Sequence, residues 1–281
     1  MKKIIIGIII LFYFNAVAEE AKPDTLYYVW IPSLVASANL SQIAFSNWTK
    51  GGENSIAWSA ITDFGLDRRG ELWTLRNQFK SSYGRTKLGG GDFRTNENEI
   101  YLENVLSYNI GWEIDPYVSN TIRTQLTAAY DYENGNKEKI ADFFDPGYII
   151  QSIGFTYDKM KVFKTRVGVA FQETFTNQYN NYADDPTTEE IESFKFETGM
   201  ESVSTGEVEF AENMRLKSKL RLFTRFEHLD VWDVRWDNQI VAKVNSFFNV
   251  NFTYLLLFEK SQSPTAQMKQ TLQMGFTYTI F

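Results

Sequence analysis

The sequence predicts an all-β protein, a single up-and-down antiparallel transmembrane β-barrel of about twelve strands. Polar and apolar residues alternate with period two from about residue 34 to the end, the pattern of strands with two different faces. The alternating runs are longer than the five to six residues of an average soluble strand. Their connections alternate between short and long, as in outer-membrane barrels.

The N-terminal segment predicts export. Lys2 and Lys3 precede an apolar run over residues 4–14, and small residues end at Ala18. A run of this length is too short to span a bilayer, so we interpret it as a secretory signal peptide cleaved after Ala18. A retained membrane anchor is the alternative. Residues 19–33 are then a short periplasmic lead-in, and 34–281 form the barrel.

Composition excludes several classes of protein. The chain has 281 residues, no cysteine, a formal net charge of −7 and 16% aromatic residues. The absence of cysteine rules out a disulfide scaffold and a lipid-anchored form. The aromatic content argues against disorder, and the acidic balance argues against nucleic-acid binding.

The elements follow from the alternation in order along the chain. In 72–83, for example, Trp73, Leu75 and Phe79 share one face and Arg76 lies on the other. We expect strands near 34–45, 54–66, 71–84, 97–113, 116–131, 147–158, 162–175, 191–203, 212–227, 233–245, 248–259 and 268–281. Short connections are expected at 68–70, 114–115, 158–161, 204–211 and 245–247, and longer ones at 46–53, 85–96, 132–146, 176–190, 228–232 and 260–267.

Aromatic residues near the strand ends fit two girdles at the surfaces of a bilayer. A soluble β-sandwich also has alternating strands, but its strands are shorter and its turns more uniform. The girdle candidates are Tyr27, Tyr28, Trp30, Trp48, Trp58, Trp73, Tyr108, Trp112, Tyr117, Tyr130, Trp232 and Trp236.

The C-terminal strand resembles the signal that the barrel-assembly machinery reads in outer-membrane proteins. Phe276 and Tyr278 lie on one face, and Phe281 is the terminal aromatic residue. Phe281 departs from the usual pattern because it is out of phase with the other two. The expected location is the outer membrane, with its lipids and the assembly machinery as partners.

Short motifs resemble an uncharacterised outer-membrane barrel family of unknown function. The opening motif comprises Asn47, Trp48, Gly51, Gly52 and Asn54, and further resemblance lies at 39–42, 142–148 and 216–223. The resemblance implies a barrel in the outer membrane, and it implies no reaction or catalytic residues. The glycines also suit an ordinary hairpin turn.

Charged residues on the polar faces predict a charged lumen. Opposite charges on neighbouring strands are expected to pair, with Arg76 and Lys80 facing Glu99 and Glu103. Two interpretations remain open: a salt-bridged, filled lumen, or a narrow passive channel or uptake barrel whose basic stripe favours small anionic solutes. The remaining candidates, beside Arg215, are Lys195, Glu197, Glu201, Lys217, Lys219, Arg221, Arg225, Asp233, Arg235 and Asp237.

Catalytic and metal-binding signals are weak. The single histidine, His228, lies in an expected outer loop without a flanking serine, so a hydrolase is the least favoured function. The acidic loop 184–190 lacks the ligand spacing of a calcium loop and is expected to be solvated. We expect no cofactor, no metal and no enzymatic activity. The leading functions are a narrow channel and, as the alternative, a structural or adhesive barrel.

Overall fold

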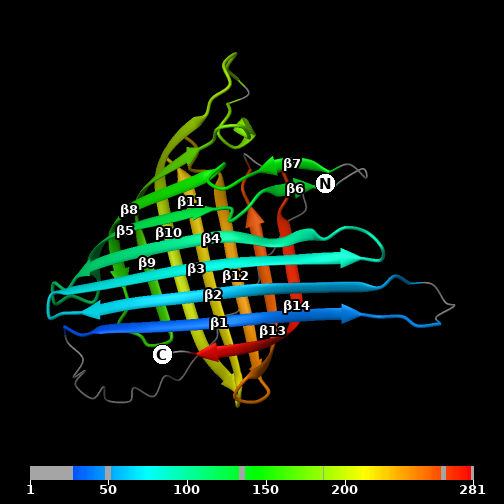
Figure 1. The fold of residues 1–281 in the computed structure, drawn as a ribbon. Helices are drawn as coiled ribbons and strands as arrows, with labels where there is room; N and C mark the ends of the chain where they lie inside the picture. The colour runs from blue at the N-terminus through cyan, green and yellow to red at the C-terminus, as the bar shows by residue number, and fades with distance from the viewer. Residues whose placement is uncertain (1–27, 48–51, 133–136, 186, 261–263, 280–281) are drawn as a thin grey trace, which may run out of the picture.

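Twelve long strands form one closed antiparallel barrel, which confirms the predicted fold class. The computed structural model describes residues 28–279 except 48–51, 133–136, 186 and 261–263. Strands of the near wall cross those of the far wall, as expected from the strand tilt that closes a barrel (Figure 1). The barrel strands are β1 (Trp30–Ile43), β2 (Ser55–Arg69), β3 (Trp73–Leu88), β4 (Arg94–Tyr108), β5 (Asp115–Thr124), β8 (Gly147–Tyr157), β9 (Phe163–Phe175), β10 (Phe194–Ala211), β11 (Met214–Arg225), β12 (Trp232–Lys243), β13 (Phe248–Phe258) and β14 (Gln267–Thr279).

The observed strands differ from the expected ones in four places. β4 ends at Tyr108 rather than at residue 113, so the short connection expected at 114–115 is 109–114. β1 begins at Trp30, inside the expected lead-in, where it pairs with Arg68 of β2. β10 continues through Ala211, so the expected connection at 204–211 is strand. The barrel strand expected at 116–131 ends at Thr124, and residues 125–146 include a small separate sheet of β6 (Ala129–Asp131) and β7 (Glu138–Ala141). The predicted signal peptide and Phe281 lie outside the described residues.

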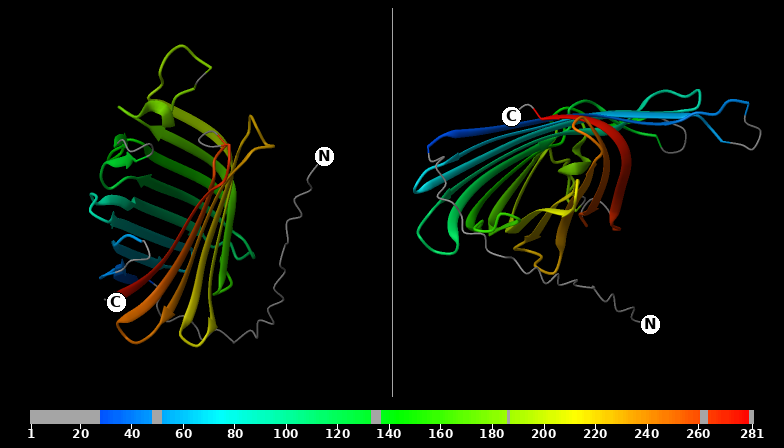
Figure 2. Two further views of the ribbon diagram at one scale, coloured as in Figure 1. Left: turned by 90° about the vertical axis from the view of Figure 1, so that its right-hand side faces the viewer. Right: turned by 90° about the horizontal axis from the view of Figure 1, so that it is seen from below.

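The two ends of the barrel have different connections. One end has the short turns 70–72, 109–114, 158–162, 212–213 and 244–247. The other has longer loops, among them the β9–β10 loop with the 3-10 helix η2 (Asn180–Tyr182), which extends beyond the strands in Figures 1 and 2. The buried Asp145 carboxylate holds this loop because it accepts backbone N–H groups of Asn177 and Gln178 at 2.9 and 2.8 Å.

The outer surface is apolar between two levels of aromatic rings. Trp73 and Tyr108 are in contact at the end with short turns, with ring centroids 4.5 Å apart. Trp58 and Tyr83 are in contact toward the other end, at 5.8 Å. Exposed Leu, Ile, Val, Phe and Met side chains occur on all sides of the barrel. Among the described residues, no helix is long and apolar enough to cross a membrane.

A cluster of buried uncharged polar side chains links β1 and β14 on the inner face. We call Asn39, Ser59, Asn249, Asn251 and Gln273 the seam cluster. Asn251 donates to Asn39 at 2.9 Å, Asn39 to Ser59 at 3.2 Å, and Ser59 to Gln273 at 3.4 Å. These bonds join β13, β1, β2 and β14, so they reinforce the strand pair that closes the barrel.

Gly275 leaves room for the seam cluster. It is opposite both Asn39 and Asn249 in the strand registers. A Cβ atom at this position would lie 2.2 Å from Oδ1 of Asn39 and 2.9 Å from Oδ1 of Asn249. A side chain here would therefore displace both amides from their hydrogen bonds.

Gly275→Ala is expected to lower the free energy of unfolding by about 1–3 kcal/mol, because overpacking would disturb these buried hydrogen bonds. Urea unfolding of the barrel in lipid vesicles measures the change. Gly90→Ala is the matched control, since a Cβ atom there has nothing within 4 Å. Equal, small effects of both substitutions would show that the space at Gly275 is not required.

Candidate functional site

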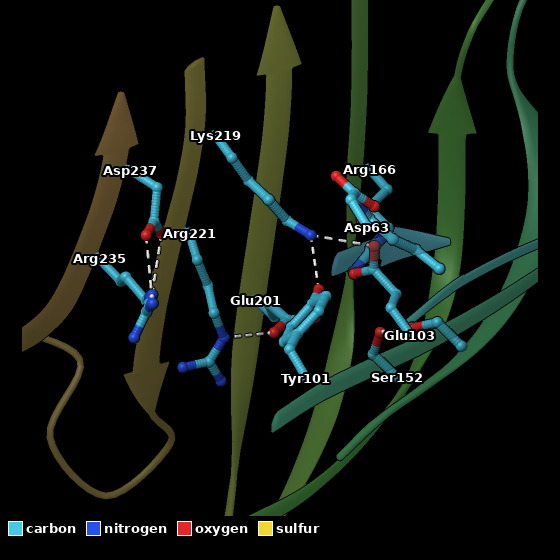
Figure 3. A network of polar contacts seen from close by, with 12 residues as sticks. Asp63, Tyr101, Glu103, Ser152, Arg166, Glu201, Lys219, Arg221, Arg235 and Asp237 are labelled. Atoms are coloured by element: carbon cyan, nitrogen blue, oxygen red, sulfur yellow. Dashed lines mark hydrogen bonds and ion pairs between the residues drawn. The ribbon is translucent and has the colours of Figure 1, made fainter. Parts of the chain in front are cut away.

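The middle of the lumen is crossed by an ion-pair network. We call Glu99, Tyr101, Glu103, Arg123, Arg166, Lys219, Arg235 and Asp237 the central network; most of its members are labelled in Figure 3. Alternation along β4 places the odd-numbered residues from Glu99 to Glu103 on the inner face, where Tyr101 and Glu103 are buried. The other members come from β5, β9, β11 and β12.

Glu103 of β4 is bound by cations from two other strands. Nη2 of Arg166 on β9 lies 2.6 Å from Oε1 of Glu103, and Nζ of Lys219 on β11 lies 2.9 Å from Oε2. Lys219 also donates to the hydroxyl of Tyr101 at 2.5 Å. In the barrel β4 and β11 are separated by four strands on one side and six on the other. The Lys219–Glu103 ion pair therefore spans the lumen.

A second ion pair spans the lumen beside the first. Arg235 of β12 donates through Nη2 to Oε2 of Glu99 on β4 at 3.1 Å. Its Nε lies 2.8 Å from Oδ2 of Asp237, two residues along the same strand. Arg123 of β5 lies 3.8 Å from Glu99 through its Nε. Opposite walls are thus connected at two neighbouring positions.

Further ion pairs follow the wall between neighbouring strands. Arg221 donates to Glu201 at 2.7 Å. Arg225 contacts Glu197 at 2.5 Å and Asp233 at 2.9 Å. These are pairs between β11 and its neighbours β10 and β12, the strands that the sequence assigned as partners. Lys195 adds a contact of 3.1 Å to Glu197.

The central network leaves little open space. The cavity within it has a volume of about 20 Å³, which is enough for about one water molecule. Five cationic side chains line it (Arg123, Arg166, Lys219, Arg221 and Arg235), against three acidic ones (Glu103, Glu201 and Asp237). Side chains from opposite walls therefore leave little space within the central network, and the lining of this cavity has more cationic than acidic side chains.

Two of the expected ion pairs differ in the structure. Arg76 is bonded to Asp158 in the β8–β9 turn. The register places Arg76 opposite Val105 and Lys80 opposite Tyr101. Glu103 is instead bound by Arg166 of β9 and Lys219 of β11. Glu99 is bound by Arg235 of β12 and by Arg123 of the adjacent β5. Pairing inside a closed barrel therefore also depends on which residues meet across the lumen.

The other predicted residues lie away from the central network. Lys217 is 3.7 Å from Glu207, and Arg215 is bonded to Glu207 and Glu209, all half-exposed or exposed near the β10–β11 turn. His228 lies exposed in the β11–β12 loop, where its carbonyl accepts the hydroxyl of Thr224 at 3.2 Å.

The motif that resembles the family lies in the first of the longer loops, between β1 and β2. Asn54 accepts the backbone N–H of Phe45 through Oδ1 at 2.7 Å. Asn47 and Gly52 have positive φ angles of 52° and 123°, and a side chain at Gly52 would meet the Phe45 ring. These residues therefore shape a turn. Trp48 and Gly51 lie outside the described residues.

Sequence reasoning missed three members of the central network. Arg166 and Arg123 follow the inward period of β9 and β5, so a complete face assignment would have found them. Tyr101 carried no such signal, because aromatic residues in a barrel are expected to face outward.

The acidic loop is folded around its own carboxylates. Glu192 accepts the backbone N–H of Asp185 at 3.0 Å and the hydroxyl of Thr188 at 2.6 Å. These hydrogen bonds lower the pKa of Glu192 to about 2. Asp185 in turn accepts from Thr187, which lowers the pKa of Asp185.

The comparisons with known proteins agree with the family resemblance. The model of the family described as "Protein of unknown function (DUF3078)" matches residues 40–130. No curated protein matches the chain.

Solved structures include similar chains. The translocator domain of autotransporter NalP from Neisseria meningitidis is 8% identical, with a TM-score of 0.36 and coverage of 89% of this chain and 88% of that one. An outer membrane channel from Pseudomonas putida F1 is 10% identical, with a TM-score of 0.38 and coverage of 92% and 99%. The beta domain of the Bordetella autotransporter Brka is 12% identical, with a TM-score of 0.32 and coverage of 88% and 98%.

Glu103→Gln is expected to destabilise the barrel by about 3 kcal/mol, because it leaves two partly buried cations without their shared carboxylate. Adding Lys219→Met should recover part of this loss, since one of those cations is then removed. Denaturant unfolding of the two single variants and the double variant gives the unfolding free energies needed for a double-mutant cycle. Strictly additive losses would show that Glu103 and Lys219 do not interact.

The β9–β10 loop is expected to loosen in acid. The pKa of Glu192 is lowered in the folded loop. The ionised carboxylate therefore stabilises the folded loop fully above about pH 4.5, and this stabilisation is lost as the pH falls through about 2. Hydrogen exchange at the Asp185 amide should lose protection over this window. Glu192→Gln should weaken the pH dependence, with Asp185 still contributing; an unchanged profile in this variant would contradict the assignment.

Proposed function

We propose that the protein is an outer-membrane β-barrel whose lumen is closed to solutes in its resting state, with a structural or surface-binding role for its outer loops. The observation that carries this proposal is the Lys219–Glu103 ion pair across the lumen, at 2.9 Å. Side chains of opposite walls meet in the middle, and the cavity between them holds about one water molecule, which supports a closed lumen.

The exterior supports the membrane placement. An apolar surface between two aromatic levels matches the band that a barrel presents to lipid. The expected export signal and the aromatic C-terminal strand are consistent with this location, and Phe276 is exposed on the outer face. Lipids of the outer membrane and the assembly machinery are accordingly proposed as partners.

A channel is the second candidate, and the lining of the cavity favours it in one respect. Five cationic against three acidic side chains would favour small anions if the central network opened. Hydrolysis at His228 has less support, because the hydroxyl of Thr224 contacts its backbone carbonyl rather than its imidazole. Our proposal therefore includes no enzymatic activity, no cofactor and no metal.

Conductance in planar bilayers tests the proposal. The purified barrel is expected to give no stable current steps. Replacing Glu103 and Lys219 together by Ser should open a path, because both side chains that meet across the lumen are shortened. The matched control replaces Glu207 and Arg215 by Ser, an ion pair of the same kind that is half-exposed and outside the central network.

Two results would contradict the closed lumen. One is stable, anion-selective conductance of the unmodified protein that Lys219→Glu weakens or reverses, which would support the channel. The other is equal conductance from the lumen double variant and its matched control.

A further inference from the structure

A row of carboxamide side chains crosses the wall formed by β3, β4, β5 and β8. Asn77 is opposite Asn104, Asn104 is opposite Asn120, and Asn120 is opposite Gln151. Directly opposed residues of antiparallel strands project from the same face of a sheet. The four side chains therefore form one continuous row, which we call the amide row.

The amide row lies on the outer surface. Val118, two residues from Asn120, is 46% exposed, and Ile153, two residues from Gln151, is 56% exposed. Residues two apart in a strand share a face. The intervening Ser119 is buried on the inner side.

The amide row lies within the apolar band. Asn77 is four residues from Trp73 and six from Tyr83, the ring-bearing residues of the two aromatic levels on β3. At about 3.3 Å per residue, it lies roughly 13 Å along the strand from one level and 20 Å from the other. Leu75 and Phe79 flank it on the same face.

The amides at one end of the amide row are hydrogen-bonded within the chain, and those at the other end are not. Asn104 donates to Asn77, and Asn77 donates to the carbonyl of Leu66, both at 2.7 Å. In the part of the chain that the structure describes, the exposed Gln151 amide has no hydrogen-bond partner. In hydrocarbon an unsatisfied amide costs several kcal/mol, so this position requires a polar partner.

We propose that the amide row, centred on Gln151, is the interface at which a second copy of this chain packs in the membrane. A carboxamide has both donors and an acceptor, so two Gln151 side chains related by a two-fold axis satisfy each other. A lipid chain offers no such group. Val118, Ile153 and Phe155, all exposed by 46% or more, supply an apolar surround. The inference rests on the membrane placement proposed above.

Cross-linking in isolated outer membranes tests the interface, because the chain has no cysteine. Ile153→Cys, which keeps Gln151 and lies beside it on the outer face of β8, should form disulfide-linked dimers under oxidation about tenfold faster than Phe252→Cys, an estimate that corresponds to 1–2 kcal/mol for a membrane amide pair. Phe252 is the matched control, an exposed outer residue of β13, five strands away.

A double variant distinguishes dimers that depend on the amide row from non-specific association of barrels in the membrane. Gln151→Leu with Asn120→Leu should leave the barrel folded, since neither amide is hydrogen-bonded within the described structure, and should abolish energy transfer between labelled copies in vesicles. Equal cross-linking of both cysteine variants, in protein that fractionates with the outer membrane, would overturn the interface and leave the membrane placement standing. Absence of the protein from that fraction would overturn both.

Discussion

A carboxylate on the inner wall of a narrow barrel has little water to solvate it, so it must find cations among the side chains that can reach it. Glu103 meets this requirement with one cation from β9 and one from β11. The requirement determines what the middle of the lumen looks like. Long side chains from both walls extend toward the middle of the lumen. The cavity left between them holds about one water molecule. The same contacts that neutralise the charge thus narrow the lumen, which is the basis of the proposed closure.

The rest of the wall satisfies its polar groups by other means. On the side of β13, β14, β1 and β2 the inner face has the uncharged seam cluster, which strengthens the closure of the sheet. On the outer face, the amide row is satisfied at Asn77 and Asn104 and leaves Gln151 open. Among the residues that the structure describes, the Asn120 and Gln151 amides have no hydrogen-bond partner in the chain, which is why this part of the outer face points to a partner.

Period-two alternation predicted most of the architecture because the two faces of a barrel wall meet different surroundings. It located nearly all barrel strands and placed Lys219, Arg221 and Glu103 on the inner face. It failed at 204–211, where the alternation simply continues and only residues 212–213 form the turn. The alternation also could not predict that Glu103 pairs with Lys219, or that Asn120 lies opposite Gln151. Those relations depend on register and on how the sheet closes, and neither is contained in the pattern of a single strand.

The most direct test of the proposed closure is the distance between Nζ of Lys219 and the carboxylate carbon of Glu103, by nitrogen–carbon dipolar recoupling in solid-state NMR of the barrel in lipid bilayers. The structure predicts direct contact, since Nζ lies 2.9 Å from Oε2, together with slow exchange of the ammonium protons with bulk water. No measurable coupling, with ammonium protons that exchange freely, would contradict the account and show an open, hydrated lumen.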